Sequence, residues 1–281
     1  MQTAARKRLG RIQARDFVAC VVLVVAALVF FFPVYWMFAT AVRPQAEIFA
    51  PEIRLWPSEF VWHNFVEAWE QLPFTRWYIN SLMIAVIAVV ITVFINLLAG
   101  YTFAKYNFRG KNVIFFMILS TLMVPIQVII VPEFLIVNEL GWLNTYWAVV
   151  LPRAAEAFGI FLVRQFMLGI PDDLIEAARL DGASEFGIFR EIVLPLSGPI
   201  IAVLTIFTFM WRWNDFAWPI AVLTDQSAYT IQLGLNLLKG IYYTEWTYIM
   251  AMSLVSVIPI LLVFVFFQRY FVEGIAHSGG R

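Results

Sequence analysis

The chain has 281 residues, of which 62% are hydrophobic and only 14% are charged, and its formal net charge is zero. Soluble domains are about a quarter charged, so this composition excludes a soluble globule and indicates a membrane protein surrounded by lipid. A neutral chain lacks the basic footprint of a nucleic-acid binder, so we expect no nucleic-acid partner. The single cysteine, Cys20, lies in an apolar run and has no second cysteine to pair with.

A short basic segment, residues 1–16, precedes the first apolar run, residues 17–38. The run carries no charge and is long enough to cross the ~30 Å hydrocarbon core of a bilayer. A signal peptide is the alternative, because Ala39-Thr40-Ala41 resembles a cleavage site. The run is longer than the apolar region of a signal peptide and ends in bulky side chains, so we predict an uncleaved span. The basic residues are Arg6, Lys7, Arg8, Arg11 and Arg15.

Residues 43–76 form a long acidic loop that is interrupted by four prolines. Within it, Phe65, Ala68 and Trp69 recur at helical spacing, which predicts a short amphipathic helix at the membrane interface. His63 has no neighbour at metal-ligand spacing. We therefore expect no metal site in the chain.

Five further apolar runs predict an all-α polytopic membrane protein with six transmembrane helices in a single domain, residues 17–281. Pro125 lies inside the third run, and a proline within a span frees a backbone carbonyl, so this helix should face protein or a cavity. The predicted spans are residues 77–104, 113–131, 145–167, 199–220 and 246–267, and the tail is residues 268–281.

Charged residues inside two of these spans are spaced i,i+3. Arg153 with Glu156, and Arg212 with Asp215, are each predicted to pair on one helix face. Ions within a membrane mark a functional site by default. The alternative is that the two neutralised pairs only fix the packing of the helices.

Lysine and arginine are unequally divided between the two predicted sides of the membrane. The side with both termini holds 13: five at the N-terminus, three after the second span, three around residues 169–196 and two in the tail. The other side holds four. By the positive-inside rule, both termini and residues 169–196 are predicted to be cytoplasmic.

Residues 170–195 are the most polar stretch between spans, and their pattern predicts two short helices joined by a tight turn. Pro171 suits the first turn of a helix, and Gly182 can adopt the left-handed conformation that ends it. Ser184 is a candidate N-cap for the second helix, which Pro195 is predicted to stop. The residues that share one face of the first helix are Leu174, Ala177, Ala178 and Asp181.

This stretch resembles the EAA loop of permease subunits of ABC importers, and its form EAARLDGAS resembles the carbohydrate-uptake branch, which includes maltose-type and glycerol-phosphate-type permeases. Matching segments occur over most of the chain, including residues 80–82, 103–111, 123–132, 164–166 and 213–215. The resemblance implies that the loop couples to a separate ATPase. The residues carried over to this role are Glu176, Ala177, Ala178, Asp181, Gly182, Ala183, Ile192, Leu194 and Pro195.

The resemblance also implies a type I ABC importer permease fold and a set of partners. These are two ATPase subunits, which would bind ATP and Mg²⁺, a second and non-identical permease, and an extracytoplasmic solute-binding protein. The location implied is the inner membrane of a prokaryote, and the substrate a sugar, oligosaccharide, polyol or glycerol-phosphate-type solute. No cofactor is expected on this chain.

Polar side chains within the apolar spans are candidates for the substrate pathway, although each is also suited to a helix–helix hydrogen bond. They are Asn96, Ser120, Thr121, Gln127, Arg153, Glu156, Thr205, Thr208 and Asn214.

No catalytic constellation occurs in the sequence, and Gly110-Lys111 lacks the upstream glycine of a phosphate-binding P-loop. We therefore expect a transport subunit and not an enzyme. A secondary transporter or channel that works alone is the alternative, but it predicts inverted repeats, and none is visible.

Overall fold

The structure is a computed structural model that describes residues 14–52, 54–240 and 244–278, with side chains between residues 16 and 270. The basic side chains predicted at the N-terminus, and the second histidine, His277, lie outside the described side chains. The chain forms two compact units. One comprises Met1–Ala68 with Gly240–Leu254, and the other comprises Trp69–Lys239 with Val255–Arg281.

The first unit contains α1 (Ala14–Ala41) and most of α2 (His63–Gln71). The most apolar window of the span Asp16–Ala41 in α1 has no buried residue, as expected of a helix that faces lipid, whereas Ala39, Thr40 and Ala41 at its end are buried. At its end, Asn64 of α2 donates hydrogen bonds of 2.8 Å and 3.0 Å to the backbone oxygens of Ala41 and Arg43. These bonds fix the chain where it leaves the span. The predicted first span and the predicted amphipathic helix are both present.

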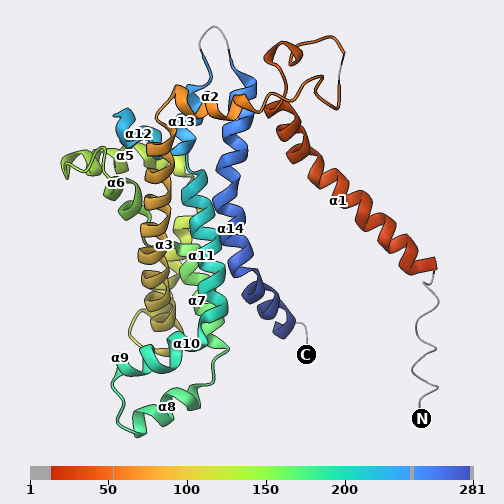
Figure 1. Cartoon of the computed structure of the whole chain (residues 1–281). Helices are drawn as coiled ribbons and strands as arrows, with labels where there is room; N and C mark the ends of the chain where they lie inside the picture. Colours follow the sequence, from red (N-terminus) through yellow and green to blue (C-terminus); the bar gives the residue numbers. More distant parts are fainter. Residues whose placement is uncertain (1–13, 53, 241–243, 279–281) are drawn as a thin grey trace, which may run out of the picture. The chain divides into compact units, whose positions relative to one another are not determined.

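The second unit is built on three helices that lie side by side, α3 (Phe74–Lys105), α7 (Ala157–Leu168) and α11 (Gly198–Asn214) (Figure 1). A stripe of small and apolar residues along α3 is buried against the other two helices. Close approach depends on Gly100 of α3, because a Cβ there would lie 2.9 Å from the backbone nitrogen of Arg164 and closer still to Val163.

Three pairs of helices bend at short breaks, two of them within predicted spans and one just before the predicted start of the fifth span. α4 (Lys111–Ser120), extended by the 3₁₀ turn η3 (Thr121–Met123), meets α5 (Ile126–Glu139) at a bend of 105°, with Pro125 at the break. α6 (Tyr146–Val150) with η4 (Leu151–Arg153) meets α7 at 49°, and Glu185–Leu196 meets α11 at 77°. Among the described residues, α1, α3 and α14 (Trp246–Ser278) are long and apolar enough to cross a membrane, and up to six spans result if each bent pair is counted as one.

The fifth span ends earlier than the predicted residue 220. α11 stops at Asn214, because Asp215 has extended backbone angles, and a separate short helix, α12 (Pro219–Val222), follows. α14 continues past the predicted end of the sixth span at residue 267 to Ser278.

The segment between α12 and α14 is partly helical and packs on α3, rather than forming a simple projecting loop. It contains η6 (Gln226–Ala228) and α13 (Ile231–Leu237). Trp77 donates a 2.7 Å hydrogen bond to the backbone oxygen of Gln226, and the backbone nitrogen of Ile231 donates one of 2.7 Å to the Ser81 hydroxyl. This end of α3 is therefore held by polar contacts.

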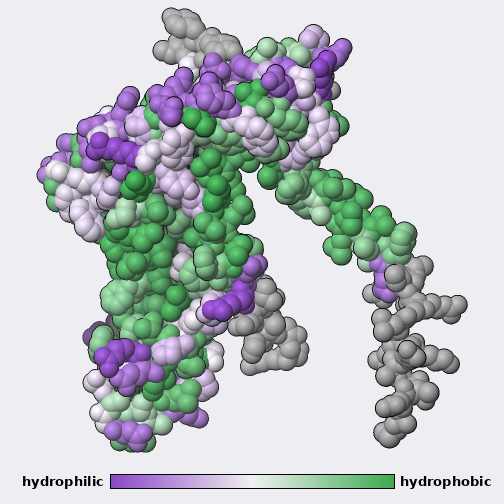
Figure 2. Space-filling model, viewed as in Figure 1, coloured by the Kyte–Doolittle hydropathy of each residue, from purple (hydrophilic) through white to green (hydrophobic). Residues whose placement is uncertain are grey.

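Hydrophobic side chains cover the middle of the second unit around α3 and α11, and hydrophilic side chains gather at the end formed by α8 (Asp172–Leu180) and α9 (Glu185–Ile188) (Figure 2). This separation is what a membrane-crossing body with a polar extramembrane segment requires.

Candidate functional site

The predicted pair of short helices is present as α8 and α9, and local hydrogen bonds define its turn. Gly182 has φ +82°. Its N–H donates to the oxygen of Arg179, and the N–H of Ala183 donates to the oxygen of Ala178, which is the pattern of a Schellman C-cap. The hydroxyl of Ser184 accepts a 3.1 Å hydrogen bond from the N–H of Gly187, so the predicted N-cap is confirmed.

The second helix ends at Leu196, one residue beyond the predicted stop at Pro195. α9 continues through a π-helical turn, η5 (Phe189–Val193), into α10 (Leu194–Leu196). The chain bends only at Ser197, whose hydroxyl donates a 2.6 Å hydrogen bond to the oxygen of Val193.

Apolar side chains anchor one face of the segment to the helical body. Ile175, Ile188, Phe189 and Val193 are buried in a cluster with side chains of α3 and α7. Lys105, at the end of α3, is 4% exposed, and its ammonium group lies 2.5 Å from a carboxylate oxygen of Asp172. The segment is thus held against α3.

The opposite face is open. Leu174, Glu176, Ala177 and Asp181 are all exposed, and Leu180, which is 89% exposed, extends from the end of α8. Leu174 and Leu180 therefore leave apolar side chains exposed beside the small side chain of Ala177. Of the predicted common face of α8, Leu174, Ala177 and Asp181 are exposed, whereas Ala178 is partly buried against the apolar cluster.

Ionic contacts stiffen the turn between α8 and α9. Arg179 donates two hydrogen bonds, of 2.7 Å and 3.1 Å, to the Glu185 carboxylate, and Tyr106 donates a third. These bonds lower the pKa of Glu185, with that from Arg179 the largest cause. The hydrogen bond from Lys105 lowers the pKa of Asp172. Both carboxyls therefore stay ionised well below neutral pH.

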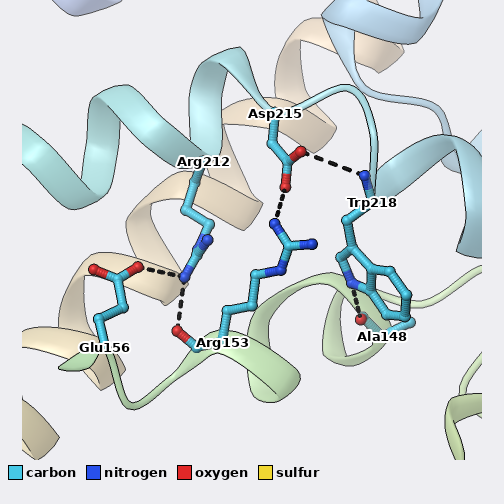
Figure 3. A network of polar contacts seen from close by, with 6 residues as sticks. All are labelled: Ala148, Arg153, Glu156, Arg212, Asp215 and Trp218. Carbon is cyan, nitrogen blue, oxygen red and sulfur yellow. Dashed lines mark hydrogen bonds and ion pairs between the residues drawn. The ribbon is translucent and has the colours of Figure 1, made fainter. Parts of the chain in front are cut away.

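A second polar site lies where α7 begins and α11 ends (Figure 3). A guanidinium nitrogen of Arg153 lies 3.1 Å from a carboxylate oxygen of Asp215, and one of Arg212 lies 2.6 Å from a carboxylate oxygen of Glu156. The predicted pairs, Arg153 with Glu156 and Arg212 with Asp215, are therefore wrong. The helices break at Ala154–Glu156 and after Asn214, so each arginine instead reaches the carboxylate of the other segment.

Further contacts complete this charged cluster, which we define as Arg153, Glu156, Arg212 and Asp215. Arg212 also donates a 2.7 Å hydrogen bond to the backbone oxygen of Arg153. The guanidinium of Arg153 lies 5.6 Å from the ring of Trp218, whose indole N–H donates to the oxygen of Ala148. The cluster thus joins three segments of the second unit.

Glu133 of α5 belongs to the surroundings of this cluster, and the sequence reasoning did not single it out. Its charge interacts with Arg153 and Arg212, and one of its carboxylate oxygens is buried with no hydrogen-bond partner among the described residues. A lone glutamate directly after Pro132 in an apolar run was the signal that was available.

The other candidate pathway residues are dispersed. Asn96 is buried beside the cluster and accepts a 3.2 Å hydrogen bond from the backbone N–H of Glu156. Thr208 is buried, with a hydroxyl that has no partner among the described residues. The remaining five lie elsewhere. Ser120 and Thr121 donate to backbone oxygens of their own helix, Thr205 lines an apolar groove, and Gln127 and Asn214 are exposed.

A family model described as "Binding-protein-dependent transport system inner membrane component" matches residues 96–277, which include the α8–α9 segment and the charged cluster. The chain belongs to this family. It is 35% identical over 256 residues to an arabinooligosaccharides transport system permease protein of Halalkalibacterium halodurans, covering 90% of this chain and 92% of the relative. It is 34% identical over 271 residues to an sn-glycerol-3-phosphate transport system permease protein of Pectobacterium atrosepticum, covering 94% and 96%.

Among solved structures, a chain of a bacterial ABC transporter involved in the import of the acidic polysaccharide alginate has a TM-score of 0.79 and 26% identity. The similarity covers 93% of this chain and 99% of that one. As an inner membrane component of a binding-protein-dependent transport system, the chain is a membrane-embedded transport subunit rather than an enzyme. The predicted family and permease fold are confirmed, and the alternative of a transporter working alone is set aside. Among the described residues, no group of three metal-ligating side chains occurs.

Proposed function

We propose that the α8–α9 segment is the contact through which ATP hydrolysis on a separate subunit drives this permease. The observation that carries the proposal is the division of the segment into two faces. One face is buried against α3 and α7, and the other presents Glu176, Ala177 and Leu180 to solvent. A segment built this way transmits a push on its outer face to the spans as a rigid body.

The segment would contact one of two ATPase subunits on the cytoplasmic side, where ATP and Mg²⁺ are bound. The excess of lysine and arginine on the side of this segment supports that orientation and cytoplasmic termini. Six spans with one coupling segment would form half of a pore, so a second, non-identical permease would supply the other half. A solute-binding protein would deliver substrate at the opposite face.

The substrate class we propose is a carbohydrate or a glycerol-phosphate-type solute. The names of the relatives, which transport arabinooligosaccharides and sn-glycerol-3-phosphate, support this class. Asn96 and Thr208 are fully buried within this subunit, so a solute that passes between two permeases would not reach their side chains. Ser120, Thr121, Gln127 and Asn214 are exposed and stay candidates for the pathway, and Thr205 lines an apolar groove.

Two variants test the coupling role. Glu176→Lys reverses a charge on the exposed face, and Gly182→Val forces a side chain into a left-handed conformation that costs about 1–2 kcal/mol. Both should reach the membrane normally, because neither changes a span, and both should lose ATP-driven uptake.

Matched controls are available for each variant. Glu59→Lys makes the same charge reversal at an exposed site outside the segment, and Gly141→Val places the same strain at another glycine of positive φ, +68°. Both controls should transport normally. Full uptake in Glu176→Lys and Gly182→Val, with the ATPase still copurifying, would refute the proposed coupling role.

A further inference from the structure

Positively charged side chains that lie outside the proposed ATPase contact gather near the turn between α3 and α4. Lys111, which begins α4, and Arg164 of α7 line a cavity of about 370 Å³. Asn107 and Asn112 add amide groups to its wall, and Phe108 adds an aromatic ring. The cavity therefore combines two cations with neutral hydrogen-bonding groups, which is the chemistry that binds a phosphate.

These cations differ from their neighbours because no carboxylate neutralises them. Lys105 and Arg179, on the same side of the second unit, pair with Asp172 and Glu185. Among the described residues, neither Lys111 nor Arg164 lies within ion-pair distance of a carboxylate. Their positive charge is left to attract an anion.

Contacts with neutral groups hold both cations in place. Arg164 donates a 3.2 Å hydrogen bond to the backbone oxygen of Phe103, and its guanidinium lies 4.5 Å from the ring centre of Phe115. The ammonium group of Lys111 lies 3.4 Å from the backbone oxygen of Ala104. The two cationic side chains are thus held in position without being neutralised, so a ligand that binds them costs little side-chain entropy.

An apolar surface continues from the cavity along α4. Val113 lines the cavity, and Phe116 and Met117 on the next turn are 68% and 56% exposed. α4 belongs to a helix pair that is apolar enough to cross the membrane. A phospholipid has both features needed here, a phosphate for the cations and acyl chains for the exposed face of α4.

We propose that this cavity binds the headgroup phosphate of an anionic phospholipid, in the leaflet on the side of the α8–α9 segment. The contact of Lys105 with Asp172 places the end of α3 beside α8, so the turn lies at the boundary between the spans and the polar segment. A basic group near an anionic membrane surface gains about 1 kcal/mol from it.

The test uses the complete transporter, purified in detergent and examined by native mass spectrometry for bound phosphatidylglycerol, with phosphatidylcholine as the neutral comparison. The double variant Lys111→Gln with Arg164→Gln should lower phosphatidylglycerol affinity by at least about tenfold, because it removes both cations. Arg164→Lys should retain binding, since it keeps the charge. Arg269→Gln, which removes an exposed cation outside the cavity, should bind as the wild type does.

Three outcomes would overturn the proposal. One is equal retention of phosphatidylglycerol by the wild type and the double variant. Another is equal retention of phosphatidylcholine and phosphatidylglycerol by the wild type. The third is displacement of the lipid by millimolar inorganic phosphate, which would identify a site for free phosphate instead of a lipid headgroup. Because binding in detergent needs neither substrate nor ATP, failure here is distinguishable from failure of the coupling role.

Discussion

The arginines of the charged cluster show how individual side chains hold two helix breaks together. Arg212 and Glu156 are 4% and 14% exposed at the side chain and lie 2.6 Å apart. A buried ion that loses its partner is left with an uncompensated charge, which costs about 3–5 kcal/mol, whereas replacing both ions by apolar groups is often nearly neutral. Both arginines are already paired, so a neutral solute finds little free charge here, and we expect a role in packing.

A double-mutant cycle tests that role. Arg212→Met should destabilise the protein by about 3 kcal/mol, and adding Glu156→Met should recover most of that loss. The measurement is the thermal unfolding of the purified transporter, with uptake selectivity followed in parallel. If Arg153→Gln changed selectivity at unaltered stability, the cluster would contact substrate and the packing role would be wrong.

Glu185 gives the polar segment a dependence on pH. Its pKa lies below the usual 4.5, because Arg179, and after it Tyr106, donate hydrogen bonds to the carboxylate. A carboxyl with a lowered folded-state pKa contributes stability that is complete above its unfolded pKa and is lost as the pH falls through the folded-state pKa. The turn between α8 and α9 should therefore be well ordered at neutral pH and become more mobile only below about pH 4.

Pulsed electron paramagnetic resonance between spin labels at Leu180 and Leu168, in a Cys20→Ser background, measures this effect. The distance distribution should broaden below about pH 4 in the wild type, and Glu185→Gln should already be broad at neutral pH. Glu191→Gln, whose ion-pair partner among the described residues is the adjacent Arg190, is the control. An unchanged wild-type distribution at about pH 3 would contradict the assignment.

At the scale of helices, the contact between α3 and α7 depends on a glycine. Gly100→Ala would place a Cβ against Val163 and the backbone of Arg164, and we expect a cost of about 1–3 kcal/mol from overpacking. Gly198→Ala, with nothing within 4 Å of the new Cβ, should be neutral or stabilising by up to about 1 kcal/mol. Thermal unfolding compares the two variants, and an unaffected Gly100→Ala would show that the helices can separate at no cost.

The sequence predicted which segments cross the membrane but not where they break. Hydropathy reports the solvent around a residue, and it is the same for a straight span and for a bent pair. Pro125 marked one break, and Pro152, two residues before the break at residues 154–156, was a local signal that the prediction of a continuous span did not use. Arg153 pairs with Asp215, and Arg212 with Glu156, because of that break, since i,i+3 spacing predicts a contact only within a continuous helix.

The polar segment was more predictable, because short-range chemistry determines it. Gly182 and Ser184 have conformations that capping rules anticipate. The π-helical turn at Phe189–Val193 was not predicted, and the helix ends one residue after Pro195. Glu133 was missed because its proximity to Arg153 exists only in the folded chain.

At the scale of the whole molecule, residues that anchor the polar segment and residues that it exposes alternate along α8. Ile175 is buried, and Glu176 and Ala177 beside it are open. The family to which the chain belongs operates in binding-protein-dependent transport, and the exposed face of α8 is where we propose that the ATPase subunit binds. The division of the chain into a basic segment and one membrane domain remains a prediction.

Photo-cross-linking from residue 177 tests the coupling claim most directly. Ala177→Cys in a Cys20→Ser chain, labelled with benzophenone maleimide in the assembled transporter, should form an adduct with the ATPase subunit on illumination. Glu59→Cys, an exposed control outside the segment, should not. Absence of an ATPase adduct from residue 177 in a transporter that still takes up substrate, or an equal adduct from residue 59, would contradict the account.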